Sequence, residues 1–80
     1  MKLPRDVGGE ELAQALARHG YEVTRQTGGH LRLTRTVAGT HHLTNSRHRH
    51  LKVGALAGIL REVAEELGLS REELTDRLWS

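Results

Sequence analysis

The sequence predicts an α+β fold with the element order α-β-β-β-α-α. Three observations support it: an apolar helical pattern that ends at Gly20, alternating apolar and polar residues between residues 21 and 44, and a longer helical pattern from Leu56 to Leu67. The 80 residues contain no linker, repeat or low-complexity tract. We therefore expect residues 1–80 to form one domain, with a thin core because so short a chain buries only about 60 to 65% of its surface.

The first helix is expected to begin at residue 8 or 9. With Gly8 as N-cap, Glu11 occupies the third helical position, and Val7 and Leu12 occupy the hydrophobic-staple positions. Gly20 is placed to end the helix in a left-handed turn.

Three antiparallel strands are expected at residues 21–25, 30–34 and 40–44. Turns at residues 28–29 and 38–39 connect them, and a polar, cationic loop follows at residues 45–50. The three strands form one sheet with one apolar face, and a period of two makes these residues its inward ones: Tyr21, Val23, Leu31, Leu33 and Leu43.

The longer helix has the strongest pattern in the chain and ends at Gly68; its apolar positions are Leu56, Ile59, Leu60, Val63 and Leu67. Gly54 and Gly58 lie on a neighbouring face, where missing side chains would let the helix sit close to the sheet. The segment from Ser70 to Glu73 is a capping box, so a short last helix is expected to run to about Trp79.

The charges are unevenly distributed along the chain. Between residues 18 and 52 seven Lys and Arg residues stand against one Glu, a net charge of +6, whereas the whole chain carries +2. Such a segment suits a phosphate-bearing partner. The chain has no cysteine, no apolar run long enough to span a bilayer and no leader-like start, so we expect a cytoplasmic protein without disulfides or membrane contact.

His30 is the first candidate for chemistry, because it follows a Gly-Gly turn and begins a strand that also carries Arg32 and Arg35. An imidazole titrates near neutral pH and can accept the proton of a ribose 2′-hydroxyl while arginines hold the phosphate. The alternative is an ordinary exposed histidine at the end of a strand.

Other candidates are weaker. His41, His42, His48 and His50 match no compact metal-ligand spacing, so we expect neither a metal nor another cofactor, and His48 is the best placed second acid. Lys52 precedes the long helix, whose free amides favour an anion. Basic side chains expected to contact a polyanion are Arg25, Arg32, Arg35, Arg47 and Lys52.

Several segments together resemble the HicA toxins, small mRNA interferases of toxin–antitoxin pairs. The resemblance is carried by MKLPRDVGGEEL at the start, GYEV, GGHLRL around His30, and LKVGAL followed by Ile59 and Leu60. It implies a double-stranded-RNA-binding-domain-like α-β-β-β-α fold, with the helices on one face of a three-stranded antiparallel sheet. It also implies metal-independent endoribonuclease activity on mRNA, catalysis by His30, and neutralisation by a HicB-like antitoxin.

The chain departs from the family pattern at three positions. Gly29 stands where serine is typical, Ser46 where proline is typical and Ala55 where threonine is typical. A non-catalytic RNA-binding module of the same fold is therefore an alternative, as is an interaction protein whose basic surface contacts an acidic partner.

Overall fold

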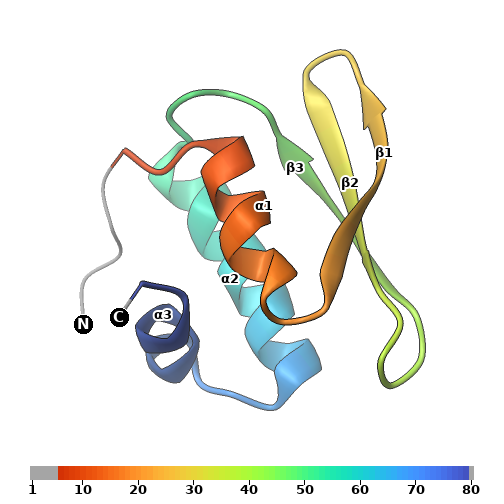
Figure 1. Ribbon diagram of the computed structural model, residues 1–80. Helices are drawn as coiled ribbons and strands as arrows, with labels where there is room; N and C mark the ends of the chain where they lie inside the picture. The colour runs from red at the N-terminus through yellow and green to blue at the C-terminus, as the bar shows by residue number, and fades with distance from the viewer. Residues whose placement is uncertain (1–5, 80) are drawn as a thin grey trace.

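The computed structural model describes residues 6–79, which form three helices and three strands (Figure 1). In chain order these are α1 (Gly9–Ala17), β1 (Tyr21–Thr27), β2 (His30–Arg35), β3 (His41–Ser46), α2 (Val53–Leu67) and α3 (Arg71–Trp79). The predicted α+β class and element order are confirmed. No helix in this part of the chain is long and apolar enough to cross a bilayer.

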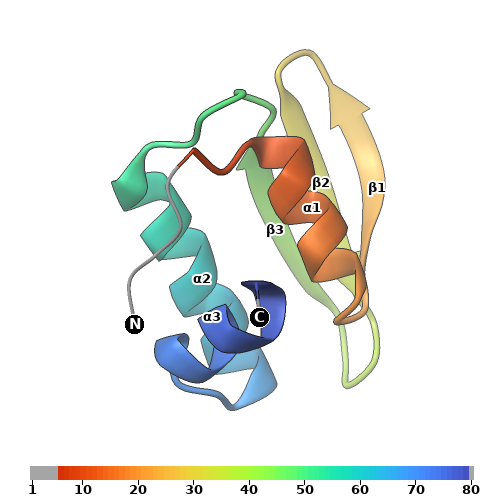
Figure 2. The same ribbon diagram turned by 60° about the vertical axis from the view of Figure 1, so that its left-hand side comes forward.

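The strands form one antiparallel sheet in the order β1-β2-β3, and all three helices lie on one side of it (Figures 1 and 2). Helix α1 contacts β1 and β3, α2 contacts β3, and α3 packs on both other helices. The core lies between the sheet and the helices, and its fully buried large apolar side chains are Leu12, Leu16, Tyr21, Leu33, Leu60, Val63 and Leu74. The opposite face of the sheet, which we call the outer face, carries no helix.

A β-bulge in β1 changes which side chains reach the outer face. Val23 pairs with Leu33, but the next pair is Arg25 with Arg32, so Thr24 is the extra residue. Strict alternation from Val23 would turn Arg25 toward the helices. The bulge places Arg25 opposite Arg32 on the outer face instead, because directly paired residues point to the same side of an antiparallel sheet.

Strand β3 runs from His41 to Ser46, further along the chain than predicted, so the expected loop at residues 45–50 begins only after Ser46. The reason is tertiary. Asn45 pairs with Leu31 and is fully buried, where its Nδ2 donates a hydrogen bond to the Gly9 carbonyl at 2.7 Å. A polar residue in a loop-like sequence is thus an inward-facing strand residue.

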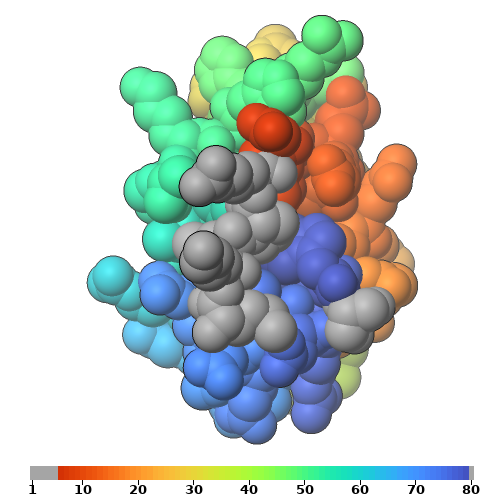
Figure 3. All heavy atoms as spheres, turned by 90° about the vertical axis from the view of Figure 1, so that its left-hand side faces the viewer, coloured from red at the N-terminus to blue at the C-terminus, as the bar shows by residue number. Residues whose placement is uncertain are grey.

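The loop at residues 47–52 is bound to the start of α1, and the view from the helical side shows the two next to each other (Figure 3). The Gly9 amide donates to the His48 carbonyl at 2.9 Å, and the Leu51 amide donates to the Val7 carbonyl at 2.8 Å. A Cβ at Gly9 would overlap the carbonyl oxygen of Ser46. The glycine is required there by a close backbone approach.

The helix ends follow the predicted signals. Gly8 is the N-cap of α1, Gly20 has φ +91°, and Gly68 caps α2 in the left-handed conformation with φ +69°. Before α3, the Ser70 amide donates to Glu73 Oε1 and the Glu73 amide donates to Ser70 Oγ, both at 3.0 Å. The capping box predicted from the sequence is therefore formed.

Candidate active site

His30 is the first residue of β2 and is exposed, as its place after the Gly-Gly turn predicts. It pairs with Thr27 of β1 and Ser46 of β3, so it lies on the outer face at the end of the sheet that carries the β1–β2 turn. Among residues 6–79 none forms a hydrogen bond or ion pair with its ring. Both ring nitrogens are therefore free to meet a substrate.

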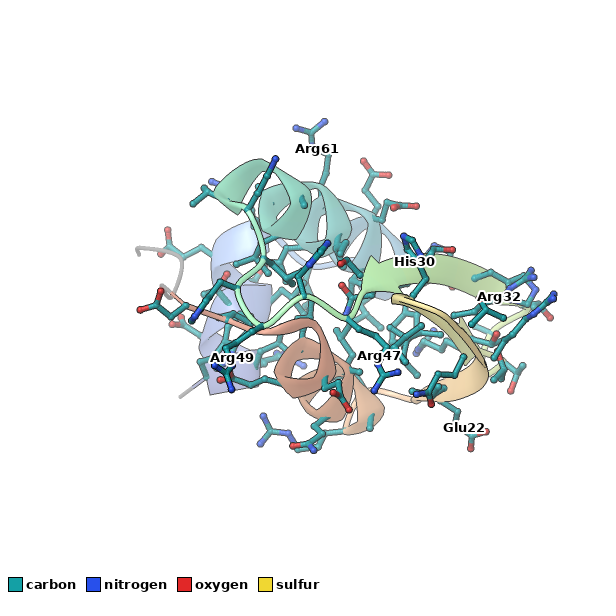
Figure 4. All side chains as sticks on the ribbon, turned by 90° about the horizontal axis from the view of Figure 1, so that it is seen from above. Glu22, His30, Arg32, Arg47, Arg49 and Arg61 are labelled. Carbon is teal, nitrogen blue, oxygen red and sulfur yellow. The ribbon has the colours of Figure 1, made fainter. Side chains whose placement is uncertain are left out.

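A shallow groove of about 460 Å³ begins at His30 and runs between β3 and α2. Figure 4 shows His30 beside the edge strand β3, toward the edge of the sheet near which α2 lies. We call this the β3–α2 groove; it is lined by His30, Thr44, Asn45, Ser46, Leu51, Gly54, Ala55, Gly58, Ile59 and Glu62.

Two glycines of α2 face this groove. A Cβ added at Gly54 or Gly58 would meet no atom within 4 Å. The prediction that these glycines let α2 pack closely on the sheet is therefore wrong. The missing side chains leave open space in the groove instead.

Arg25 and Arg32 form a pair of like charges directly opposite each other on the outer face. Both are exposed, and in the described part of the chain neither has an ion-pair partner. Like charges directly opposite in a sheet destabilise it unless an anion compensates them. Arg32 is two residues from His30 on the same strand face, roughly 7 Å along the strand.

Arg35 does not lie beside His30, and this part of the predicted site is wrong. It pairs with Tyr21 at the other end of β2 and on the inward side of the sheet. Its Nε donates to the His19 carbonyl at 3.0 Å, and its Nη1 lies 3.6 Å from Glu66 Oε2 with only 14% of the side chain exposed. The surrounding contacts are those of a structural arginine.

Arg47, His48 and Lys52 lie at the same end of the molecule as His30 but not in the β3–α2 groove. The Arg47 amide donates to the Gly29 carbonyl at 2.7 Å, while its Nη2 is 3.6 Å from Glu10 Oε2. Figure 4 shows the Arg47 side chain on the α1 side of the sheet end and His30 on the α2 side. Lys52 is exposed and is the N-cap residue of α2.

His48 is exposed, and its backbone is held at both ends. Its amide donates to Ser46 Oγ at 3.1 Å, and its carbonyl accepts from the Gly9 amide. Ser46 is the position at which the resemblance noted from the sequence leads us to expect proline. The serine hydroxyl thus restrains the loop through a local hydrogen bond where a proline would restrain it through its ring.

The other histidines are held apart by the fold. His41 Nδ1 bonds the Tyr21 hydroxyl at 2.7 Å on the inward side, whereas His42 Nδ1 bonds Thr34 Oγ1 at 2.8 Å on the outer face. His50 Nδ1 is 3.6 Å from Asp6 Oδ1. Within residues 6–79 no three His, Cys, Asp or Glu side chains gather as a metal site would require.

Sequence reasoning missed the groove itself. Thr44, Asn45 and Ser46 come from segments predicted to be a strand end and a loop, and Glu62 comes from the long predicted helix but is not one of its apolar positions. The available signal was the pair Gly54 and Gly58, spaced one helical turn apart. The same pair also fits close packing of the helix on the sheet, because a sequence does not say which face of a helix meets the sheet.

Comparison with protein families finds one match that covers most of these elements. A family model described as the HicA toxin of bacterial toxin–antitoxin systems matches residues 9–64, which is more than half of the 80-residue chain. No curated protein and no solved structure matches the chain. The matched segment includes β2 with His30, the arginine pair and the whole β3–α2 groove, and the chain belongs to the HicA toxin family.

Proposed function

We propose that this toxin is a metal-independent endoribonuclease that cleaves mRNA, with His30 as its general base. The observation that supports this most is the position of His30. Its ring is exposed and, among residues 6–79, forms no hydrogen bond or ion pair. It lies at the β3–α2 groove and on the same sheet face as Arg25 and Arg32, which have no ion-pair partner among these residues. A polyanion with a reactive hydroxyl matches that combination.

In the proposed reaction, His30 takes the proton of a ribose 2′-hydroxyl, and the resulting oxygen attacks the adjacent phosphorus. The bond from phosphorus to the 5′-oxygen breaks, so the products are a 2′,3′-cyclic phosphate and a 5′-hydroxyl. The leaving oxygen takes up a proton, for which His48 on the neighbouring loop is our candidate donor. Each such proton transfer contributes about 10² to 10⁴ in rate.

Arg25 and Arg32 are proposed to hold the phosphate groups next to His30. Their backbones are paired across the sheet, so both guanidinium groups extend from the same place on the outer face and can stabilise the growing negative charge of the transition state. Lys52, the N-cap residue of α2, and Arg47 add cationic groups to the proposed surface, and the Arg47 Nη2 also lies 3.6 Å from Glu10 Oε2. Arg35 does not belong to this set, because its guanidinium group already pairs with Glu66 and donates a hydrogen bond to the His19 carbonyl.

Membership of a toxin–antitoxin family implies a protein partner that neutralises the toxin. We propose a HicB-like antitoxin that covers His30 and the arginine pair. The activity belongs in the cytoplasm, where mRNA is translated. A small open reading frame for such a protein next to the toxin gene is the expected genetic context.

The direct test is incubation of the purified protein with RNA, with and without EDTA. Cleavage under both conditions supports the proposal, and His30→Ala should reduce it by about 10² to 10⁴ while leaving the fold intact, because His30 is exposed. His48→Ala should slow cleavage comparably if it is the proton donor, and an unchanged rate would remove it from the mechanism.

Two other outcomes would reject a metal-independent ribonuclease. Binding without cleavage would indicate the non-catalytic RNA-binding module. This is the alternative suggested by Gly29, which stands where serine is expected. Cleavage that disappears with EDTA would indicate a metal-dependent nuclease.

A further inference from the structure

Gly54 and Gly58 have no structural explanation within α2. Gly54 lies in the first turn of α2 and Gly58 in its interior, where glycine destabilises a helix relative to alanine. Neither has the positive φ that favours glycine, and neither has a neighbour that a Cβ would strike. Glycine at position 58 therefore lowers the stability of the helix, and both glycines leave the β3–α2 groove free of side chains at their positions.

The groove is unsuited to phosphate. None of its lining residues is Lys or Arg, and Glu62 carries a negative charge. Arg25 and Arg32, by contrast, lie outside it on the outer face. A nucleotide placed at His30 would thus meet the two arginines on one side and, on the other, a groove without Lys or Arg whose one acidic residue is Glu62. The groove matches the neutral part of the nucleotide, its base.

The polar groups of the groove are rich in hydrogen-bond acceptors. Asn45 is fully buried, and its Nδ2 is used by the Gly9 carbonyl, which fixes the amide orientation. Its Oδ1 has no partner among residues 6–79. A buried acceptor without a partner is unusual in a folded protein. Because this oxygen is itself buried, the acceptor that a ligand in the groove meets is the exposed Glu62 carboxylate, which favours a ligand that donates N–H groups.

We propose that the β3–α2 groove binds the base of the nucleotide whose 2′-hydroxyl His30 deprotonates, and that it prefers bases with an exocyclic amino group. This rests on the proposed ribonuclease function. One helical turn between Gly54 and Gly58 rises about 6 Å, enough for a flat heteroaromatic ring to lie on exposed backbone. The base in the groove places its ribose at His30 and the adjacent phosphate at the arginine pair.

The test uses four 2′-O-methyl RNA oligonucleotides, each with one unmodified nucleotide that is adenosine, cytidine, guanosine or uridine. Only that nucleotide can be cleaved, so its base is the one in the groove. The wild-type protein should cleave after adenosine, cytidine or guanosine faster than after uridine by on the order of tenfold or more, since only uracil lacks the amino donor.

Two pairs of variants separate the groove from the rest of the protein. Gly58→Leu fills the groove and should lower kcat/KM for the preferred oligonucleotide by on the order of tenfold or more. Glu65→Leu, on the same helix outside the groove, should not. Leucine is a better helix former than glycine, so Gly58→Leu should melt at least as high as the wild type. Glu62→Gln should weaken the preference for cytidine over uridine, and Glu65→Gln should leave it unchanged.

The outcomes distinguish the two proposals. Equal cleavage after all four bases, or full activity of Gly58→Leu, would overturn the base subsite and leave the proposed ribonuclease function unaffected. If the wild type cleaves no RNA, the ribonuclease falls, and the groove is then tested by fluorescence anisotropy with the same oligonucleotides. Equal affinity of the wild type and Gly58→Leu in that assay would overturn the groove as well.

Discussion

Single residues decide which side chains reach the end of the sheet where we propose that RNA is cleaved. The His30 ring is exposed because β2 begins directly after the second glycine of the turn. The cross-strand neighbours of His30, Thr27 and Ser46, are also small. Arg25 reaches the outer face only because Thr24 is a bulge residue. Arg35, on the same strand as His30, is held on the inward side by Glu66. Residue type alone does not separate a substrate-facing arginine from a structural one.

Gly9→Ala is predicted to destabilise the fold by about 1 to 3 kcal/mol or more. The new Cβ would overlap the Ser46 carbonyl and push the 47–52 loop away from α1. Urea denaturation measures the free energy of unfolding. Gly29→Ala is the control, because a Cβ there meets nothing within 4 Å, and it should be close to neutral. A Gly9→Ala protein as stable as the wild type would contradict the observed approach of the two segments.

At the scale of elements, the site depends on three segments meeting at one end of the molecule: the β1–β2 turn, the 47–52 loop and the start of α2. The Arg47 amide links this loop to Gly29, and the Gly9 amide links it to α1. Helix α3 lies away from the sheet and contributes to the core through Leu74 and Leu78. Its contribution is to stability, since it packs on α1 and α2.

Ser70→Ala should lower the free energy of unfolding by about 1 kcal/mol, typical for loss of an N-cap. The change removes the acceptor of the Glu73 amide. Hydrogen bonds from the Ser70 backbone and side chain lower the pKa of the Glu73 carboxyl, so this pKa should rise in the variant, as NMR titration can measure. Ser70→Thr keeps the hydroxyl and should retain most of the stability. Equal stability of the alanine and threonine variants would argue against the cap.

At the scale of the whole molecule, the fold has one side that forms the core and another on which we propose that RNA binds. The helices and inward face hold the core, and the outer face with its adjoining groove is left open (Figure 2). The buried Tyr21, bonded to His41, belongs to the first side. Burial, and next the charge of Glu66, raise the pKa of Tyr21 to about 12.

This pKa predicts a loss of stability in alkali. Below about pH 10 the tyrosine is protonated in the folded and unfolded states alike. Between about pH 10 and about pH 12 the unfolded state loses the proton first, so stability falls there by on the order of 2 to 3 kcal/mol. Urea denaturation across this range measures the slope. Tyr21→Phe should flatten it, and an unchanged slope in that variant would assign the loss to other groups.

The sequence predicted most of the fold because local signals and tertiary structure agree. The capping box at Ser70, the left-handed glycines at Gly20 and Gly68 and the inward leucines of β2 needed no knowledge of distant residues. The bulge at Thr24, the burial of Asn45 and the open space at Gly58 depend on what lies across the sheet or beside the helix. For this reason the position of His30 was predictable, whereas its groove and the place of Arg35 were not.

The measurement that tests the central claim most directly is the chemistry of the cleaved ends. We expect RNA cut by the wild-type protein in EDTA to carry 2′,3′-cyclic phosphate and 5′-hydroxyl ends, and His30→Ala to produce neither above background. A 3′-hydroxyl with a 5′-phosphate, or cyclic phosphate formed by His30→Ala at the wild-type rate, would contradict a histidine that deprotonates the ribose.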